Sequence, residues 1–149
     1  SGLTHLHLVV DGHGGDAKAL QDSDLIYTFL DTLPDQIGMT KMIPPQVYTY
    51  HGQKPQDWGV SGFVLIAESH ISVHTFPDRQ HINVDIFSCK SFDADECVKA
   101  VDTAFGLTRV KTQILERGLE YMNDHEAYSG MVRERIGIAP PTNIGHART

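Results

Sequence analysis

Three chemically reactive residues, Glu68, Ser69 and His70, occupy the corner between two apolar runs of the sequence. The runs cover residues 63–67 and 71–76 and are rich in β-branched and aromatic side chains, which is typical of strands. Chains that only turn between two strands usually place Gly, Asn, Asp or Pro at the corner. An acid, a hydroxyl and an imidazole at this position therefore indicate chemistry rather than a simple turn.

Metal binding is the first chemistry to consider, because the chain contains nine histidines. His70 and His74 are four residues apart, a spacing that suits one ion on a helix but not on a strand. Four residues of strand span about 13 Å, whereas a zinc–nitrogen bond is about 2 Å long. One ion cannot be held by both rings, so we expect no metal site here.

A serine hydrolase is the second possibility. Gly59-Val60-Ser61-Gly62 approaches the nucleophile-elbow pattern G-x-S-x-G, but its last glycine comes one position early. The elbow also opens a helix, whereas this segment leads into a strand. The pattern is weak evidence, and a plain hairpin with exposed polar residues is the simpler alternative to it.

The density of reactive side chains on two predicted strands argues against that plain hairpin. Successive residues of a strand point to opposite faces, so His70 and His74 share one face of the strand after the corner. A further predicted strand, residues 82–89, ends at Cys89. If the two strands are neighbours, we expect Ser69, His74 and Cys89 to converge on one side of the sheet.

Two helices and several strands complete the predicted fold. One helix begins at Asp22 or Ser23 and stops at Pro34; the other begins at Asp93, in a capping box, and is capped by Gly106. Hairpin-linked strands with two helices predict an α+β fold, a mostly antiparallel sheet with both helices packed on one face. The glycine-rich residues 12–15 are expected to form a loop, and the tail beyond residue 118 a short helix or loop. The predicted strands cover residues 3–10, 46–50, 63–67, 71–76, 82–89 and 108–115.

Length, charge and cysteine content limit the classes of protein to which this chain can belong. The 149 residues fit a single domain, 1–149, and the net charge of −7 argues against nucleic-acid binding, which needs clustered Lys and Arg. No apolar run reaches the roughly 18 residues of a membrane span, and no signal peptide is recognisable, so we expect no membrane partner. Two cysteines do not make a disulfide framework, which favours the reducing cytoplasm.

The segment GVSGFVLIAESHISVHTFP, followed by VDIFSC, resembles the processing and active-site region of prokaryotic S-adenosylmethionine decarboxylases. These are pyruvoyl enzymes that arise from a self-cleaving proenzyme. The resemblance is dense from Trp58 to Cys89 and rests elsewhere mainly on the order of elements. It implies the sandwich fold of that family, which agrees with the predicted α+β class.

The resemblance implies that the corner is a cleavage site. The hydroxyl of Ser69 would attack the carbonyl of Glu68, elimination would expel the Glu68 carboxylate and leave dehydroalanine, and hydrolysis would convert this to a pyruvoyl group made from Ser69. The products would be a β chain, residues 1–68, and an α chain, residues 69–149. By the same matching, His74 is the base that assists elimination and Ser61 helps the acyl shift, although the Ser61 hydroxyl has a purely structural alternative.

The pyruvoyl cofactor would form a Schiff base with the amine of an amino-acid substrate and accept electrons as carbon dioxide leaves. The resulting carbanion must be protonated, and Cys89 matches the proton donor of the family. A thiol with a reference pKa of about 8.5 is mostly protonated at neutral pH and can deliver that proton. Cys97 lies in the apolar stripe of the second helix, where small core packing is the better explanation.

S-adenosylmethionine is the substrate that the family implies, as a step of spermidine and polyamine biosynthesis. Phe76 matches one of the rings that stack on adenine, and Asp78 matches the carboxylate that holds the ribose, where Glu is commoner. The second ring position is occupied by Pro55, although Trp58 or Tyr50 can substitute. The shortened acid and the missing ring both weaken nucleoside recognition.

Two alternatives remain open at this point. The same pyruvoyl chemistry can act on L-arginine or L-ornithine, whose distal cation needs carboxylates such as Asp11, Asp16 or Asp78. A non-catalytic relative that regulates a partner subunit is the other alternative, which the intact Glu68-Ser69 pair argues against. The resemblance also implies a homodimer with the active site between protomers.

Overall fold

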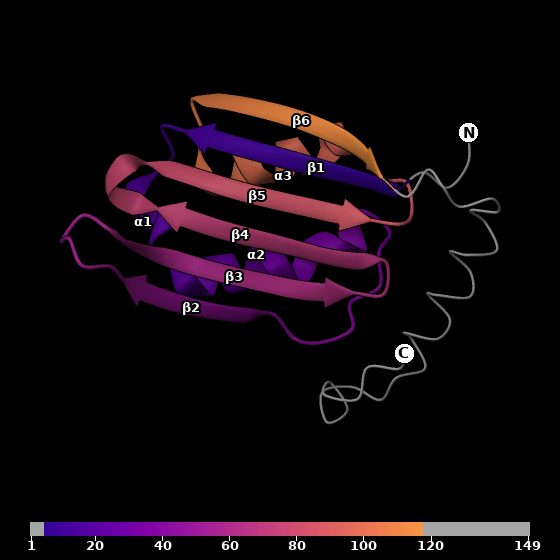
Figure 1. The fold of residues 1–149 in the computed structure, drawn as a ribbon, viewed down its shortest axis with the longest axis horizontal. Coiled ribbons are helices and arrows are strands. Elements are labelled where there is room, and N and C mark those ends of the chain that lie inside the picture. The colour runs from indigo at the N-terminus through magenta and orange to yellow at the C-terminus, as the bar shows by residue number, and fades with distance from the viewer. Residues whose placement is uncertain (1–4, 118–149) are drawn as a thin grey trace.

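A six-stranded antiparallel sheet forms the framework of the computed structural model, which describes residues 5–117 (Figure 1). The strands lie in the order β2-β3-β4-β5-β1-β6, and each neighbouring pair is antiparallel. The strands are β1 (His5–His13), β2 (Gln46–His51), β3 (Trp58–Ile66), β4 (Ser69–Phe76), β5 (His81–Ser88) and β6 (Arg109–Arg117).

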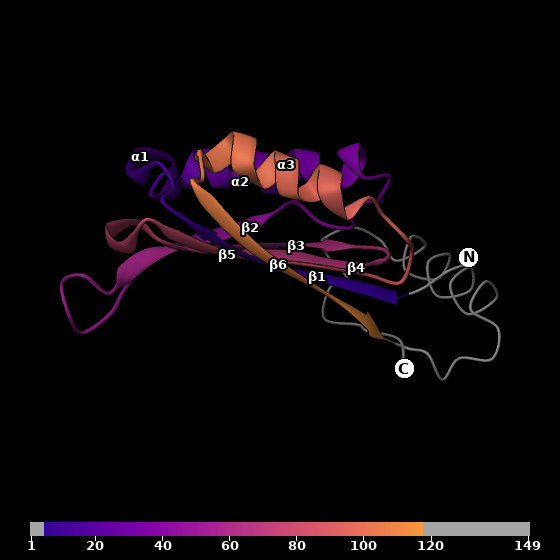
Figure 2. The ribbon, with the colours of Figure 1, turned by 90° about the horizontal axis from the view of Figure 1, so that it is seen from above.

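All helices longer than one turn in the described residues cover the same face of this sheet, and no helix of residues 5–117 lies on the opposite face, which we call the open face (Figure 2). This arrangement confirms the predicted α+β class with an antiparallel sheet. None of these helices is both long and apolar enough to cross a membrane. The helices are α1 (Ala17–Leu20), α2 (Ser23–Gln36), α3 (Ala94–Phe105) and the 3-10 turn η1 (Pro77–Arg79).

The two long helices begin and end at residues that satisfy their free backbone groups. Asp22 caps α2, because its carboxylate accepts hydrogen bonds from the amides of the first turn. Asp93 caps α3 by accepting from the Glu96 amide at 3.1 Å, which is one half of the predicted capping box. Gly106 ends α3 in the left-handed conformation, with a φ of 62°.

The hydrophobic core lies between the helices and the covered face of the sheet. Alternation places Leu8, Val64 and Val84 on this face, and each is at most 1% exposed. Phe29 of α2 meets Phe105 of α3 edge to face, with ring centroids 5.5 Å apart. The core therefore fixes which face each strand turns outward, including the strands that carry the reactive residues.

Several sequence predictions differ from the structure, among them the strand predicted over 63–67, which begins five residues earlier, at Trp58. The short helix α1 was not predicted, because four residues are too few for a periodic pattern; Asp16 caps it through the Lys18 amide. Strand β1 continues through Gly12, where an added Cβ would collide with neighbouring side chains, instead of ending before a loop. Helix α2 includes Pro34 and ends two residues later, and the predicted tail beyond residue 118 lies outside the described residues.

Candidate active site

The Glu68–Ser69 junction is the end of a two-residue connection between β3 and β4, and its peptide carbonyl is already hydrogen-bonded. The Cys89 amide donates to the Glu68 carbonyl oxygen at 2.9 Å, and the Ala67 amide donates to the Thr40 carbonyl oxygen at 2.8 Å. A fixed N–H donor on a carbonyl polarises it and stabilises negative charge that develops on its oxygen. The junction is thus arranged for nucleophilic attack at the Glu68 carbonyl carbon.

The Glu68 side chain is turned into the protein instead of toward solvent. It is 2% exposed, and one carboxylate oxygen accepts a hydrogen bond from the Thr40 amide at 3.1 Å. A buried carboxylate needs such partners, because desolvation without them is costly. Glu68 is therefore anchored on both its backbone carbonyl and its side chain, and this anchoring fixes the position of the following residue, Ser69.

Cys89 lies against the junction, immediately after β5. Its side chain is 1% exposed and packs with Ala67, with Met42 beside them. The hydroxyl of Ser88 donates to the Lys90 carbonyl oxygen at 2.7 Å and accepts from the Lys90 amide at 2.9 Å. This local turn holds the backbone of Cys89 in the orientation that lets its amide reach the Glu68 carbonyl.

Ser61 and His74 form a second reactive pair at a different place on the sheet. They are directly opposite one another in β3 and β4, and Ser61 Oγ lies 2.8 Å from His74 Nδ1. Next to them, the buried Thr75 hydroxyl accepts from the Val60 amide at 3.0 Å, which ties the two strands together. The pair has the contact that a hydroxyl and a base need for proton transfer.

The predicted convergence of Ser69, His74 and Cys89 is only half right. Strands β4 and β5 are neighbours, as predicted, and Cys89 adjoins the junction. His74, however, is five residues along β4 from Ser69, which at the rise of a strand is about 17 Å. Within one chain the Ser61–His74 pair therefore cannot touch Ser69.

A cluster of charged and aromatic side chains covers the open face beside Ser69. Nε2 of His7 lies 3.0 Å from an Asp85 carboxylate oxygen, and the Arg117 guanidinium lies 4.2 Å from the Phe87 ring centre. His70 packs on Phe87, with centroids 5.8 Å apart. Burial lowers the pKa of His70, as do His7 and Arg117 to a smaller extent, and Asp85 acts in the opposite direction. His70 thus favours its neutral form.

Sequence reasoning missed His7 and Arg117 in this cluster. The alternation of His5 and His7 with apolar residues gave a weak signal for His7, because it placed the two on one strand face. Arg117 gave none, since only the pairing of β6 with β1 brings it within 3.4 Å of the His7 ring. Long-range pairing of this kind has no local pattern.

The predicted substrate-binding residues lie at the opposite end of the sheet from Ser69. Phe76 packs on His81, with ring centroids 5.6 Å apart, and Asp78 is exposed in η1. Trp58 stacks on His51 with an interplanar angle of 16°. By alternation, Trp58 belongs to the covered face of β3, on the other side of the sheet from Phe76.

Tyr50 is the aromatic residue that shares the open face with Phe76. It is paired with Gly59, and an added Cβ at Gly59 would lie 3.2 Å from the Tyr50 hydroxyl. Burial is the main cause that raises the pKa of Tyr50, with a further contribution from Asp57, so the phenol is neutral at physiological pH. Of the two substitutes for the missing ring, the structure favours Tyr50.

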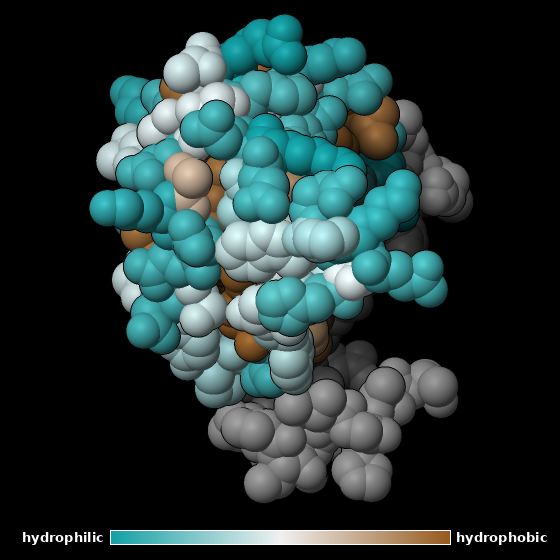
Figure 3. Space-filling view, turned by 90° about the vertical axis from the view of Figure 1, so that its left-hand side faces the viewer, coloured by the Kyte–Doolittle hydropathy of each residue, from teal (hydrophilic) through white to brown (hydrophobic). Residues whose placement is uncertain are grey.

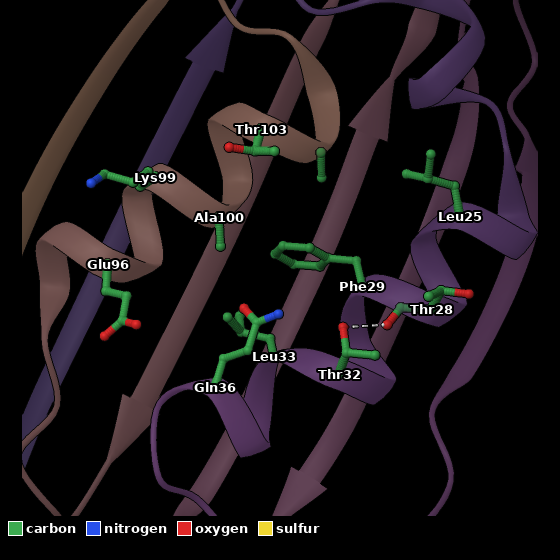
Figure 4. Close-up of a pocket in the computed structure, with 11 residues that line it drawn as sticks. Leu25, Thr28, Phe29, Thr32, Leu33, Gln36, Glu96, Lys99, Ala100 and Thr103 are labelled. Carbon is green, nitrogen blue, oxygen red and sulfur yellow. Dashed lines mark hydrogen bonds between the residues drawn. The ribbon is translucent and has the colours of Figure 1, made fainter.

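A cavity of about 440 Å³ lies between α2 and α3, on the covered side of the sheet and thus on the far side from Phe76, Tyr50 and His70 (Figure 4). Its lining, which includes Phe29 and Lys99, contains no predicted site residue. Cys97 is buried nearby in α3, and burial raises the pKa of its thiol to about 12. These observations support a structural role for Cys97 and leave the open face as the candidate site.

Comparison with known proteins identifies the family of this chain. A family model described as S-adenosylmethionine decarboxylase matches residues 6–118. The chain belongs to the S-adenosylmethionine decarboxylase family. It is 32% identical over 113 residues to an S-adenosylmethionine decarboxylase proenzyme of Clostridium botulinum, which covers 75% of this chain and 92% of the relative.

Further relatives of the S-adenosylmethionine decarboxylase family support the assignment. A proenzyme of that name from Aquifex aeolicus is 32% identical over 127 residues, covering 82% of this chain and 88% of the relative. The crystal structure of the adenosylmethionine decarboxylase from Aquifex aeolicus matches with a TM-score of 0.65 and 28% identity. That match covers 83% of this chain and 98% of the solved chain. These matches establish that the chain belongs to a family of decarboxylases and that it has the fold of that family.

Proposed function

We propose that this chain is a self-processing, pyruvoyl-dependent decarboxylase of S-adenosylmethionine. The observation that carries the proposal is the hydrogen bond from the Cys89 amide to the Glu68 carbonyl, at the bond predicted to break. The relatives are named as proenzymes of S-adenosylmethionine decarboxylase, which supports both a precursor and this substrate. The activity would supply an aminopropyl donor to spermidine synthesis.

The residues at the junction fit the formation of a pyruvoyl group. Attack of Ser69 Oγ on the Glu68 carbonyl carbon forms an ester as the peptide C–N bond breaks, and the proton of the hydroxyl moves to the freed amine. The Cys89 amide stabilises the oxyanion of that step. A base then removes the Ser69 α-hydrogen, and the Glu68 carboxylate leaves with the serine oxygen, so that position 69 becomes dehydroalanine. Tautomerisation to an imine and hydrolysis by water then release ammonia and leave the pyruvoyl group.

Cys89 has a second role in the proposal, as the donor of a proton to the product. A pyruvoyl carbonyl at position 69 supplies the sink for the electron pair released with carbon dioxide. The Cys89 thiol, next to position 69, is the acid that delivers a proton to the substrate carbon. Ala67 packs against this thiol before cleavage, so breakage of the chain after Glu68 frees the segment that covers it.

Cys89→Ala is expected to separate the two reactions. The variant retains its backbone amide and hence the hydrogen bond to the Glu68 carbonyl, so the chain still cleaves. It lacks the thiol, so decarboxylation falls by about 10²- to 10⁴-fold, the usual effect of removing a general acid. Gel electrophoresis and release of labelled carbon dioxide measure the two effects. The matched control, Cys97→Ala, changes neither, and an uncleaved Cys89→Ala chain that folds normally would contradict the assignment.

A homodimer is the second part of the proposal, and geometry supports it. Ser61 Oγ and His74 Nδ1 are 2.8 Å apart, within hydrogen-bond distance. His74 lies about 17 Å along β4 from Ser69 of the same chain. A second copy of the chain, placed against the open face, can bring its own pair to Ser69. Each processing site would then contain residues of both protomers.

The positions of the acidic candidates support S-adenosylmethionine rather than arginine or ornithine. Asp16 caps α1, so its carboxylate already accepts a hydrogen bond from the Lys18 amide. Asp11 lies on β1, which is two strands from β4 and Ser69 in the sheet, so neither acid is placed beside Ser69 to hold the distal cation of a small basic amino acid. Phe76 and Tyr50, on the same face, instead offer rings suited to a nucleoside, with Asp78 nearby for its ribose.

Turnover of carboxyl-labelled substrates tests the function directly. The purified, cleaved protein is incubated separately with S-adenosylmethionine, L-arginine and L-ornithine, and released carbon dioxide is counted. We expect release from S-adenosylmethionine, with the arginine and ornithine reactions at background. Release from arginine or ornithine alone would overturn the substrate, and no release by fully cleaved protein would overturn the activity.

The proposal includes a reducing, cytoplasmic setting. Cys89 and Cys97 are both buried and are not joined in a disulfide, which is compatible with a reducing compartment.

A further inference from the structure

His13 and His81 form a close pair of imidazoles at the margin of the open face. They are directly opposite one another in β1 and β5, and their Nδ1 atoms are 3.3 Å apart. The ring centroids are separated by 4.6 Å, with an interplanar angle of 42°. Figure 3 looks at this end of the molecule, next to η1, where the surface is largely hydrophilic.

We propose that His13 and His81 together bind a nitrogen-preferring transition-metal ion such as Zn²⁺. Two zinc–nitrogen bonds of about 2.0–2.1 Å at a tetrahedral angle place their nitrogen atoms about 3.3–3.4 Å apart. The observed separation of 3.3 Å already has this value. The ion would lie beside the line between the two nitrogens, so each ring must turn to direct its lone pair at the metal.

The surroundings of His81 prepare one of the two nitrogens to act as a ligand. Nε2 of His81 lies 2.7 Å from the side-chain oxygen of Asn83, which can only accept a hydrogen bond. Nε2 therefore carries the proton, and Nδ1 of the neutral ring presents its lone pair toward His13. A hydrogen bond of this kind to the distal nitrogen is the usual support of a metal-ligating histidine. The Phe76 ring, 5.6 Å away, packs against His81.

Metal binding changes which ring nitrogen of His13 carries its proton. Without metal, the Nδ1–H of His13 donates to Nδ1 of His81. With metal, the His13 proton moves to its own Nε2 through solvent, and both Nδ1 lone pairs contact the ion. Both rings stay neutral, so no net proton is released and no other reactant is needed.

The remaining groups near the pair determine which ions it selects. No group of three or more His, Cys, Asp or Glu side chains in residues 5–117 could hold a metal, so water completes the coordination. Arg109, paired with His13 across the sheet, opposes a cation, and Asp11 on the same face of β1 favours one. With charge nearly balanced, the two nitrogens decide the affinity, which favours Cu²⁺, Ni²⁺ and Zn²⁺ over Mg²⁺.

This site differs from the one that sequence spacing excluded. That argument concerned His70 and His74, which lie on one strand and are too far apart for one ion. His13 and His81 are 68 residues apart in the sequence and meet only because β1 pairs with β5. The proposed metal site depends only on His13 and His81, and it is independent of the proposed decarboxylase function.

Calorimetric titration of the full chain with ZnCl₂ tests the proposal, with wild type, His13→Ala, His81→Ala and the matched control His51→Ala. His51 is an exposed histidine on β2 that stacks on Trp58. We expect each of the first two variants to bind one ion fewer per chain than wild type, and His51→Ala to bind as wild type. Unchanged binding by His13→Ala and His81→Ala, with wild-type circular dichroism, would overturn the site.

A second variant tests whether His13 and His81 bind one ion together or act independently. Asn83→Ala keeps both imidazoles but removes the acceptor that fixes the His81 tautomer, so the zinc affinity is expected to fall by about tenfold or more. Histidine ring signals in nuclear magnetic resonance should shift together for His13 and His81 on addition of Zn²⁺, and not on addition of MgCl₂. Zinc-dependent shifts of only one ring would contradict a shared ion.

Discussion

Replacing Ser69 with Ala is expected to leave the chain as one polypeptide of 16.5 kDa, where the wild type separates into two fragments. The hydroxyl is the only group removed, and it is the nucleophile of the proposed cleavage, without which neither dehydroalanine nor the pyruvoyl group can form. Without it, carbon dioxide release should fall to background, a loss of about 10⁶-fold or more for a typical enzyme. Denaturing electrophoresis and intact-mass measurement read the cleavage, and the labelled-substrate assay reads the turnover.

Ser72→Ala is the matched control for this experiment. Ser72 lies on the same strand, three residues on and partly exposed, and it is outside the junction and the Ser61–His74 pair. The Ser72→Ala chain should cleave and turn over as wild type does. Cleavage of the Ser69→Ala chain at the same bond would refute the proposed nucleophile, and a wild-type chain that stays whole would refute self-processing itself.

The local features of this fold were readable from the sequence because each depends on neighbours along the chain. Alternation in β4 correctly placed His70 and His74 on one face, opposite the buried Ile71, since a strand has a period of two. The caps at Asp22 and Asp93 were likewise predictable, because a carboxylate satisfies amides two or three residues away. The resemblance over residues 58–89 is local in the same sense.

Contacts that depend on strand register could not be read in this way. The contact of Ser61 with His74 follows from where β3 pairs with β4. The separation of Ser69 from His74 does not depend on register: five residues of one strand span about 17 Å, so the sequence spacing alone already opposed the predicted convergence. The pairs His7–Arg117 and His13–His81 join residues 110 and 68 positions apart. One residue of slip in either ladder would turn these side chains to the other face, so only the assembled sheet places them.

Co-expression of two inactive variants is expected to restore cleavage in one of them, if the Ser61–His74 pair acts on the Ser69 of a partner. His74→Ala has the nucleophile but no base, and Ser69→Ala has the base but no nucleophile. In a mixed dimer the intact His74 comes from the Ser69→Ala chain and serves the Ser69 of the other chain. The His74→Ala chain should then be cut, and the Ser69→Ala chain should remain whole.

Distinguishable tags on the two chains make the outcome unambiguous. With equal expression and random pairing into two-fold dimers, about half of the His74→Ala chains should be cleaved, against none when that variant is expressed alone. His51→Ala, which alters a histidine away from the pair, should be cleaved on its own. If native mass spectrometry demonstrates mixed dimers and no His74→Ala chain is cut, the base does not act across the dimer. Processing would then require Ser69 and His74 of one chain to meet, which the spacing of about 17 Å along β4 opposes.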